Sequence, residues 1–137
     1  MANSFPFSLV TPERTLMRCD ASMVILRTGG GDIAFMAGHA PFIGNLEPCV
    51  MTVTTSDGET KRAAVHAGFV HVANSVVRVL ADVAELPDEI DVERARAAMV
   101  RAEETLMHSN DAGVEAALRR AHVRLDLAST RSGNGSR

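Results

Sequence analysis

The residues best suited to binding chemistry are four arginines and an aspartate in the last third of the chain. Asp91, Arg94 and Arg101 are separated by steps of three and seven positions, which bring side chains to one face of a helix. Arg120 and Arg124 are one helical turn apart further along the chain. If two helices carrying these residues fold back on each other, the guanidinium groups can converge, and their forked geometry suits phosphate oxygens. The spacing thus indicates an anion site between two helices.

An ordinary solvated surface is the alternative interpretation of these arginines. Acidic residues stand close by, several of them at the three- or four-residue spacing of ion pairs on one helix. They are Glu93, Glu103, Glu104 and Glu115. Both interpretations, a phosphate site and a set of surface ion pairs, stay open at this point.

The motifs of common enzyme classes are missing from the sequence. It contains no GxGxxG, GxxxxGK[ST], HExxH or GxSxG pattern. The glycine run at residues 29–31 is followed by strand-like residues, so it lacks the helix N-terminus of a phosphate loop. Cys19 and Cys49 stand 30 positions apart without a CxxC pattern, which favours two free thiols over a disulfide or a zinc site. We therefore expect a chain that is not catalytic by itself and requires no cofactor.

Composition and charge are typical of a globular protein whose main partner is not nucleic acid. Of its 137 residues 46% are hydrophobic and 23% charged, which disfavours wholesale disorder. The net charge is −3 and no basic stripe is present to neutralise phosphates of DNA or RNA. No apolar run approaches the ~18 residues of a spanning helix, and the N-terminus lacks the charged head of a signal peptide. We expect no direct membrane insertion, and attachment to a membrane only through another protein.

The elements that must position these residues differ between the two parts of the chain. Up to residue 86 the pattern is that of strands, because Phe5, Phe7 and Leu9 alternate with other residues and Asp-Gly at residues 57–58 favours a tight hairpin. Short strands with frequent turns and no intervening helix predict an all-β sandwich or barrel.

After Pro87 the apolar period becomes helical. Two seams recur at three- and four-residue spacing: Val92, Ala95, Met99, Ala102 and Leu106, then Val114, Ala117, Leu118, Ala121, Leu125 and Ala128. Their alanines allow two antiparallel helices to approach closely. We therefore predict an α+β fold: a β-sandwich over residues 1–86, an antiparallel helical hairpin over 87–128, and a disordered tail over 129–137.

Four short motifs follow one another in the chain. They are the opening strand at residues 7–14, a G-D-x-x-x-x-x-G-H-x-P pattern at 31–41, paired strands at 68–72 and 76–82, and an I/L-D-x-x-R-A signature at 90–95. In this order, and followed by a helical hairpin, they resemble the bacterial-type epsilon subunit of the F-type ATP synthase over nearly the whole chain. Ala37 stands where that family usually has proline, and Ala67 where it often has a second glycine, so the loop shapes stay open.

The resemblance implies a non-catalytic subunit of the central stalk. Its sandwich would bind the gamma subunit and the rotor c-ring, coupling proton transport to ATP synthesis at the cytoplasmic face of the plasma membrane. Its helices would regulate ATP hydrolysis, contacting the alpha and beta subunits when they extend. Asp32, Gly38 and His39 would be contact residues for the rotor ring. The local alternative is that Gly38 supplies a positive φ angle and His39 caps a backbone group.

The resemblance also implies a regulatory ligand, because some bacterial members of the family bind ATP at the helical hairpin. Ile90, Asp91, Arg94 and Ala95 match the signature directly, whereas Glu85, Arg101, Arg120 and Arg124 match in position and spacing. Two functions of other classes remain as alternatives: a free-standing adenine-nucleotide sensor without an assembly partner, and a small β-sandwich enzyme.

Overall fold

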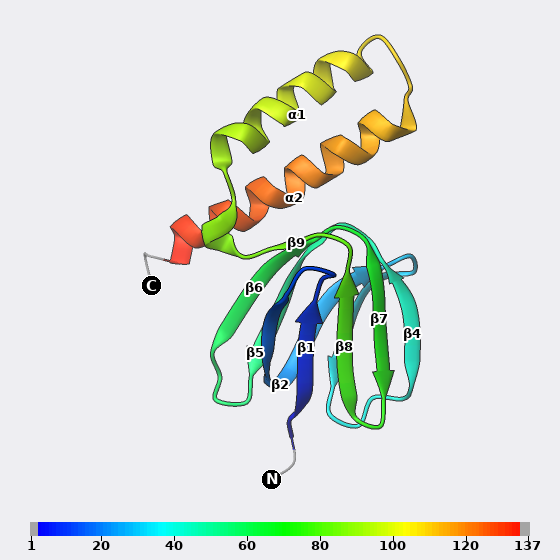
Figure 1. The fold of residues 1–137 in the computed structure, drawn as a ribbon, viewed down its shortest axis with the longest axis vertical. Coiled ribbons are helices and arrows are strands. Elements are labelled where there is room, and N and C mark those ends of the chain that lie inside the picture. The colour runs from blue at the N-terminus through cyan, green and yellow to red at the C-terminus, as the bar shows by residue number, and fades with distance from the viewer. Residues whose placement is uncertain (1–2, 135–137) are drawn as a thin grey trace.

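The computed structural model describes residues 3–134, with side chains through Ser129, and it contains strands followed by helices (Figure 1). The strands are β1 (Phe5–Val10), β2 (Thr15–Thr28), β3 (Gly31–Met36), β4 (Phe42–Leu46), β5 (Cys49–Thr55), β6 (Thr60–Val65), β7 (Gly68–Ala73), β8 (Val76–Ala81) and β9 (Ala84–Glu85). They are followed by the 3-10 turn η1 (Pro87–Glu89), α1 (Val92–Leu106) and α2 (Ala112–Asn134). The predicted fold class is confirmed.

The sheet closes into a sandwich because the long strand β2 belongs to both of its layers. The strand order is β1-β8-β7-β4-β2-β5-β6-β9, with β3 paired to β2. β1 runs parallel to β8 on one side and antiparallel to β2 on the other, which closes the path. Alternate residues of the strands fill the interior, as Phe5, Phe7 and Leu9 do on β1. Cys19 and Cys49 are both free and half-buried, as predicted.

The helical hairpin packs on itself and on one end of the sandwich. Asp91 is the N-cap of α1, where its side chain accepts a hydrogen bond from the backbone N–H of Arg94 at 3.1 Å. Along the helix pair the small side chains are buried, among them Ala95 and Ala102 on α1 and Ala121 on α2. α2 lies between α1 and the sandwich in Figure 1, and it contacts β5, β6 and η1.

A small apolar cluster joins α2 to the sandwich. It consists of Ala64, Ile90, Val123, Leu127 and Ala128, with Val50 and Val92 packed against it. The main core inside the sandwich is a separate and larger cluster. No helix in the described part of the chain is long and apolar enough to cross a membrane.

The end of α2 corrects the predicted boundary of the tail. The helix continues through Asn134, so residues 129–134 are helical, whereas residues 135–137 of the predicted tail lie outside the described residues. Ser, Thr and Arg cost an established helix only a few tenths of a kcal/mol each, and extending a helix requires no new nucleus. Polar composition alone therefore does not end this helix.

Candidate functional site

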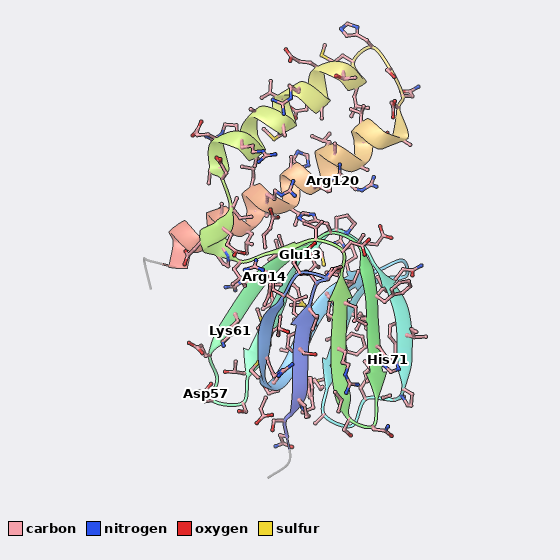
Figure 2. All side chains as sticks on the ribbon, in the orientation of Figure 1. Glu13, Arg14, Asp57, Lys61, His71 and Arg120 are labelled. Atoms are coloured by element: carbon pink, nitrogen blue, oxygen red, sulfur yellow. The ribbon has the colours of Figure 1, made fainter. Side chains whose placement is uncertain are left out.

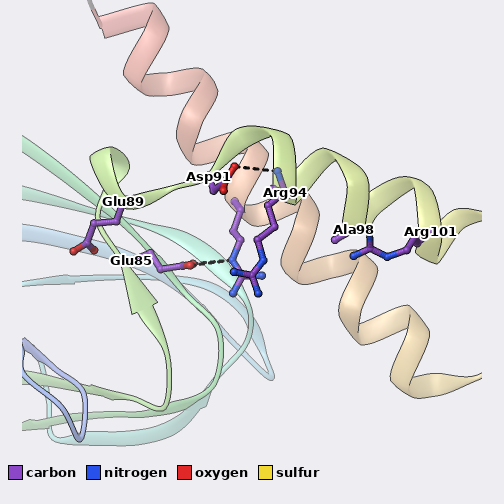
Figure 3. Close-up of a pocket in the computed structure, with 8 residues that line it drawn as sticks. Glu85, Glu89, Asp91, Arg94, Ala98 and Arg101 are labelled. Atoms are coloured by element: carbon purple, nitrogen blue, oxygen red, sulfur yellow. Dashed lines mark hydrogen bonds and ion pairs between the residues drawn. The ribbon is translucent and has the colours of Figure 1, made fainter.

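A pocket of about 430 Å³ lies where the last strand of the sandwich meets the helical hairpin (Figure 3). The residues that line it are Glu85, Glu89, Asp91, Arg94, Ala95, Ala98, Arg101 and Arg124. Three arginines and three carboxylates thus surround a space with the size of a ligand site. The pocket combines donors for phosphate oxygens with acceptors for hydroxyl or amino groups.

Helix α1 supplies one wall through a single face. Asp91, Arg94, Ala95, Ala98 and Arg101 follow one another at steps of three, one, three and three positions, which keeps their side chains on the same side. The short alanine side chains leave the volume that the arginines surround. Within the described side chains, neither Arg94 nor Arg101 forms an ion pair.

The opposite wall is held by an ion pair between the sandwich and α2. Nε of Arg124 donates to both carboxylate oxygens of Glu85, at 2.9 and 3.1 Å. Nε2 of His66 lies 2.9 Å from Oε1 of the same carboxylate. Partial burial raises the pKa of Glu85, but the hydrogen bonds from His66 and Arg124 outweigh burial and hold this pKa below its ordinary value. Glu85 is therefore an ionised carboxylate that ties β9 to α2.

Six of the eight residues predicted for nucleotide binding line this pocket: Glu85, Asp91, Arg94, Ala95, Arg101 and Arg124. Ile90 does not, because it is buried in the apolar cluster under α2. Arg120 is half-buried on α2, one turn before Arg124, and is not among the lining residues (Figure 2). Glu93 pairs with Arg96 at 3.1 Å rather than with a pocket arginine. Arg94 and Arg101 are exposed and form no ion pair within the described side chains, so a solvated surface stays open as the interpretation of these two arginines.

Sequence reasoning missed Glu89 and Ala98 in the pocket wall. Ala98 had a signal, because it stands midway between Arg94 and Arg101 on the same helical face. Glu89 had none, because its place depends on the turn η1 and on Arg14 of the β1–β2 connection. Nη2 of Arg14 donates to Glu89 at 2.6 Å, and the backbone N–H of Leu86 donates to the same carboxylate at 2.8 Å.

The three residues predicted for rotor contact do not form one loop. Asp32 lies near the start of β3, where it pairs with Nε of Arg27 at 2.8 Å, and this exposed pair holds the pKa of Asp32 below its ordinary value. Gly38 and His39 follow the other end of β3. Gly38 has a φ angle of 81°, and Nδ1 of His39 lies 2.7 Å from the carbonyl oxygen of Ala40, as the local interpretation expected.

A second surface, which sequence reasoning did not assign, is an apolar patch on the outer face of the sandwich. Phe69 on β7 and Leu80 on β8 are direct partners in the sheet, yet they are 53% and 47% exposed. Val10 on β1 stands next to Leu80 in register. Together with Thr11, Pro12, Ala81 and Asp82, these residues line a shallow hollow of about 310 Å³. A contiguous apolar surface of this kind is typical of a protein–protein contact.

Comparison with known proteins covers both parts of the chain. Residues 4–87 match the family model described as "ATP synthase, Delta/Epsilon chain, beta-sandwich domain", and residues 88–129 match the "long alpha-helix domain" of the same chain. The protein named ATP synthase epsilon chain in Streptomyces avermitilis is 44% identical over 131 residues, which are 96% of this chain and 100% of that one. The protein of the same name in Bacillus pumilus is 40% identical over 124 residues, covering 88% of this chain and 94% of that one.

Solved structures share the fold at lower identity. A chain in the Euglena gracilis mitochondrial ATP synthase superimposes with a TM-score of 0.70 at 21% identity, covering 96% of this chain and 81% of that one. A chain in the central stalk and c-ring structure of the Tetrahymena thermophila mitochondrial ATP synthase gives a TM-score of 0.61 at 13% identity, with coverage of 92% and 94%. At these identities the likeness concerns the fold alone.

Proposed function

The chain belongs to the delta/epsilon family of ATP synthase subunits as a non-catalytic epsilon chain, and we propose that its sandwich binds the gamma subunit and the c-ring while its helical hairpin regulates ATP hydrolysis. The observation that carries this proposal is that both domains match the family models in order. The relative named epsilon chain also aligns with this chain almost end to end. It would work at the cytoplasmic face of the plasma membrane, held there by the rest of the complex.

The apolar patch formed by Val10, Phe69 and Leu80 is the surface that suits the gamma subunit. It lies on the sandwich and is exposed while the hairpin is docked. Burying about half of two large apolar side chains contributes favourably to a contact, at roughly 25 cal/mol per Å² of apolar area. The turn at Gly38 and His39 is proposed to contact the c-ring, where a ring nitrogen next to a backbone carbonyl supplies polar recognition.

Co-purification with gamma tests the assembly role. A truncated chain ending at Pro87 keeps every strand of the sandwich and should still bind gamma in a stoichiometric complex. Loss of binding, in a truncated chain that remains folded by circular dichroism, would contradict the proposal that the sandwich suffices. A full-length chain that never associates with gamma would instead favour the free-standing nucleotide sensor.

We also propose ATP as a regulatory ligand of the pocket at the helical hairpin. Arg94 and Arg101 are available to phosphate oxygens, since no ion pair within the described side chains engages them, and Arg124 is already fixed by Glu85. Both helices and β9 contribute to the pocket, so a ligand there would favour the docked hairpin over an extended one. Calorimetric titration of the isolated subunit tests this role, and no heat at millimolar ATP would contradict it.

The turn at Gly38 and His39 has a test of its own in the reassembled ATP synthase. His39→Ala should reduce proton-coupled ATP synthesis, and it should lower the stability of the isolated subunit by only about 0.5–1.5 kcal/mol, the contribution of the ring contact between His39 and Phe35 at 4.8 Å. Unchanged coupling would leave the histidine with its local role, the contact between Nδ1 and the carbonyl oxygen of Ala40.

A further inference from the structure

A buried histidine that contacts the pocket residue Glu85 has a role that sequence reasoning did not assign. The side chain of His66, which directly follows β6, is 3% exposed. Nε2 of its ring faces Oε1 of Glu85, and because an ionised carboxylate can only accept, Nε2 carries the hydrogen and donates it. The other ring nitrogen, Nδ1, is buried without a hydrogen-bond partner in the described part of the chain.

This unpaired nitrogen argues against a role in packing alone. Burying a polar atom without a partner costs stability, and an apolar side chain of similar volume avoids that cost. The imidazole is therefore explained by what its paired nitrogen does. That nitrogen contacts Glu85, which is the carboxylate that holds Arg124 of α2.

The sheet fixes the geometry of this contact from the sandwich side. β6 and β9 pair antiparallel, with Ala64 opposite Glu85, and the backbone N–H of His66 donates to the carbonyl oxygen of Val83 at 3.1 Å. Both His66 and Glu85 are thus held by the backbone ladder. Arg124 comes from the helical hairpin, so the three side chains form a chain of contacts from the sandwich to α2.

Apolar contacts alone do not determine how α2 rests on the sandwich. The cluster around Ala64, Ile90 and Leu127 is small, and burial of apolar area is not directional. The hydrogen bonds of the Glu85 carboxylate to His66 and Arg124, by contrast, are directional. With Nε of Arg124 bound to Glu85, the terminal amino groups of Arg124 form no ion pair within the described side chains and stay available at the pocket.

We propose that His66 is a positioning residue, which orients the Glu85 carboxylate toward Arg124 and thereby holds the helical hairpin docked on the sandwich. Its effect on docking is independent of any ligand. Its effect on nucleotide affinity rests on the proposed function, because the pocket requires the docked hairpin.

Three substitutions in the full chain separate this role from packing. In His66→Gln the amide nitrogen reaches about as far as Nε2 of the imidazole and can still donate to Glu85. In His66→Asn the amide reaches only as far as Nδ1 of the imidazole and cannot donate to Glu85. His66→Leu fills a similar volume without a donor. Hydrogen exchange without nucleotide should therefore be about tenfold faster in α1 and α2 for the Asn and Leu variants, the factor expected from one lost charge-assisted hydrogen bond. The helices of His66→Gln should exchange at the rate of the wild-type protein.

The strands supply the internal control. A residue that serves packing alone would speed exchange in β6 and β9 as much as in the helices, and the Gln and Asn variants would then be equivalent; either result overturns the proposal.

A double variant tests whether His66 acts through Arg124. In an Arg124→Gln background, His66→Leu should speed the exchange of the helices by less than a further factor of about two, because contacts of one network are not additive. Full additivity would also overturn it. If His66→Leu fails to fold, the Gln and Asn pair carries the test.

The proposed function fails separately. If the unchanged protein binds no ATP in calorimetry but its helices are released by His66→Asn, the positioning role stands and the nucleotide role is lost. If ATP binds and the Asn variant binds it about as tightly, with no release of the helices, the positioning role of His66 is overturned instead.

Discussion

At the scale of residues, the arginines of the pocket offer a phosphate two kinds of contact. Arg124 is fixed in place by Glu85, so a ligand meets a guanidinium whose orientation is already set. Arg94 and Arg101 form no ion pair within the described side chains and can move toward the ligand. A prepositioned donor costs less entropy on binding than a mobile one. Replacing Arg124 would also remove its contact with Glu85, so Arg94 and Arg101 are the cleaner positions at which to test binding of an anionic ligand.

Arg94→Ala should weaken ATP binding by one to two decades, because a charge-assisted contact contributes about 1.5–3 kcal/mol. Arg94→Lys should restore only part of the affinity, since lysine keeps the charge and loses the fork. Arg96→Ala is the matched control: Arg96 stands two positions away on α1, pairs with Glu93 and does not line the pocket. Calorimetry gives all the dissociation constants, and equal losses for Arg94 and Arg96 would contradict a specific site.

Glu85 makes the docking of the hairpin dependent on pH. Its pKa in the folded protein is below the ordinary value of 4.5, so its contribution to stability is present above pH 4.5 and is lost as the pH falls through the folded-state pKa. Glu85→Gln removes the charge at every pH. The difference in thermal midpoint between the two proteins should be a few degrees at pH 5 and should shrink below about pH 4. A difference that persists at pH 3 would show that the charge is not the cause.

The candidate site could be predicted from the sequence only where its residues share a local pattern. The signature at residues 90–95 and helical spacing placed Asp91, Arg94 and Arg101 on one face. Ile90 belongs to the same signature but does not line the pocket, because whether an apolar residue faces the pocket or the sandwich depends on how α2 docks. Glu89 and His66 depend on contacts 75 and 19 positions away in the chain, with Arg14 and Glu85, which no local period encodes.

At the scale of elements, the strands and helices followed from the change of apolar period, but their pairing did not. β2 pairs with its chain neighbours β1 and β3 and also with β4 and β5, and pairing with strands further along the chain leaves no local signal. The end of α2 was misplaced because composition suggested a tail where the helix continues to Asn134. Backbone geometry at single turns, by contrast, can be tested directly.

Gly68 opens β7 with a φ angle of 138°, and a Cβ atom there would lie 2.0 Å from the carbonyl oxygen of Leu80. Gly68→Ala should therefore lower the free energy of unfolding by about 1–3 kcal/mol for backbone strain alone, with the clash adding to this. Gly29→Ala is the matched control, because a Cβ atom at Gly29 meets nothing within 4 Å and no positive φ angle is involved. Urea unfolding of both variants measures the difference, and equal stabilities would contradict the geometry.

At the scale of the whole molecule, the hairpin is joined to the sandwich by few contacts. Among the described residues, a cluster of five buried apolar side chains and the Glu85–Arg124 pair connect α2 to the sandwich, whereas the sandwich has its own, larger core. Such a unit can leave the sandwich without unfolding it. A ligand at 100 times its dissociation constant favours the docked form by about 2.7 kcal/mol, which is enough to reverse a balance of one or two kcal/mol toward an extended form.

The sandwich should meet the rest of the complex through the patch of Val10, Phe69 and Leu80, whatever the state of the hairpin. Phe69→Ser and Leu80→Ser together should weaken the binding of gamma at least tenfold, because fully burying one large apolar side chain contributes about 1.5–3 kcal/mol and these two half-exposed side chains together bury about as much area. Both side chains are about half exposed, so the isolated subunit should keep most of its thermal stability.

Met36→Ser is the matched control for the patch. Met36 is 57% exposed but lies on β3, whose sheet partner is β2 rather than β7 or β8, so its loss should leave the binding of gamma unchanged. Equilibrium binding to immobilised gamma measures all variants. If the double variant binds like the unchanged chain, gamma contacts another face of the sandwich. If Met36→Ser weakens binding equally, apolar exposure in general, rather than this patch, is what gamma recognises.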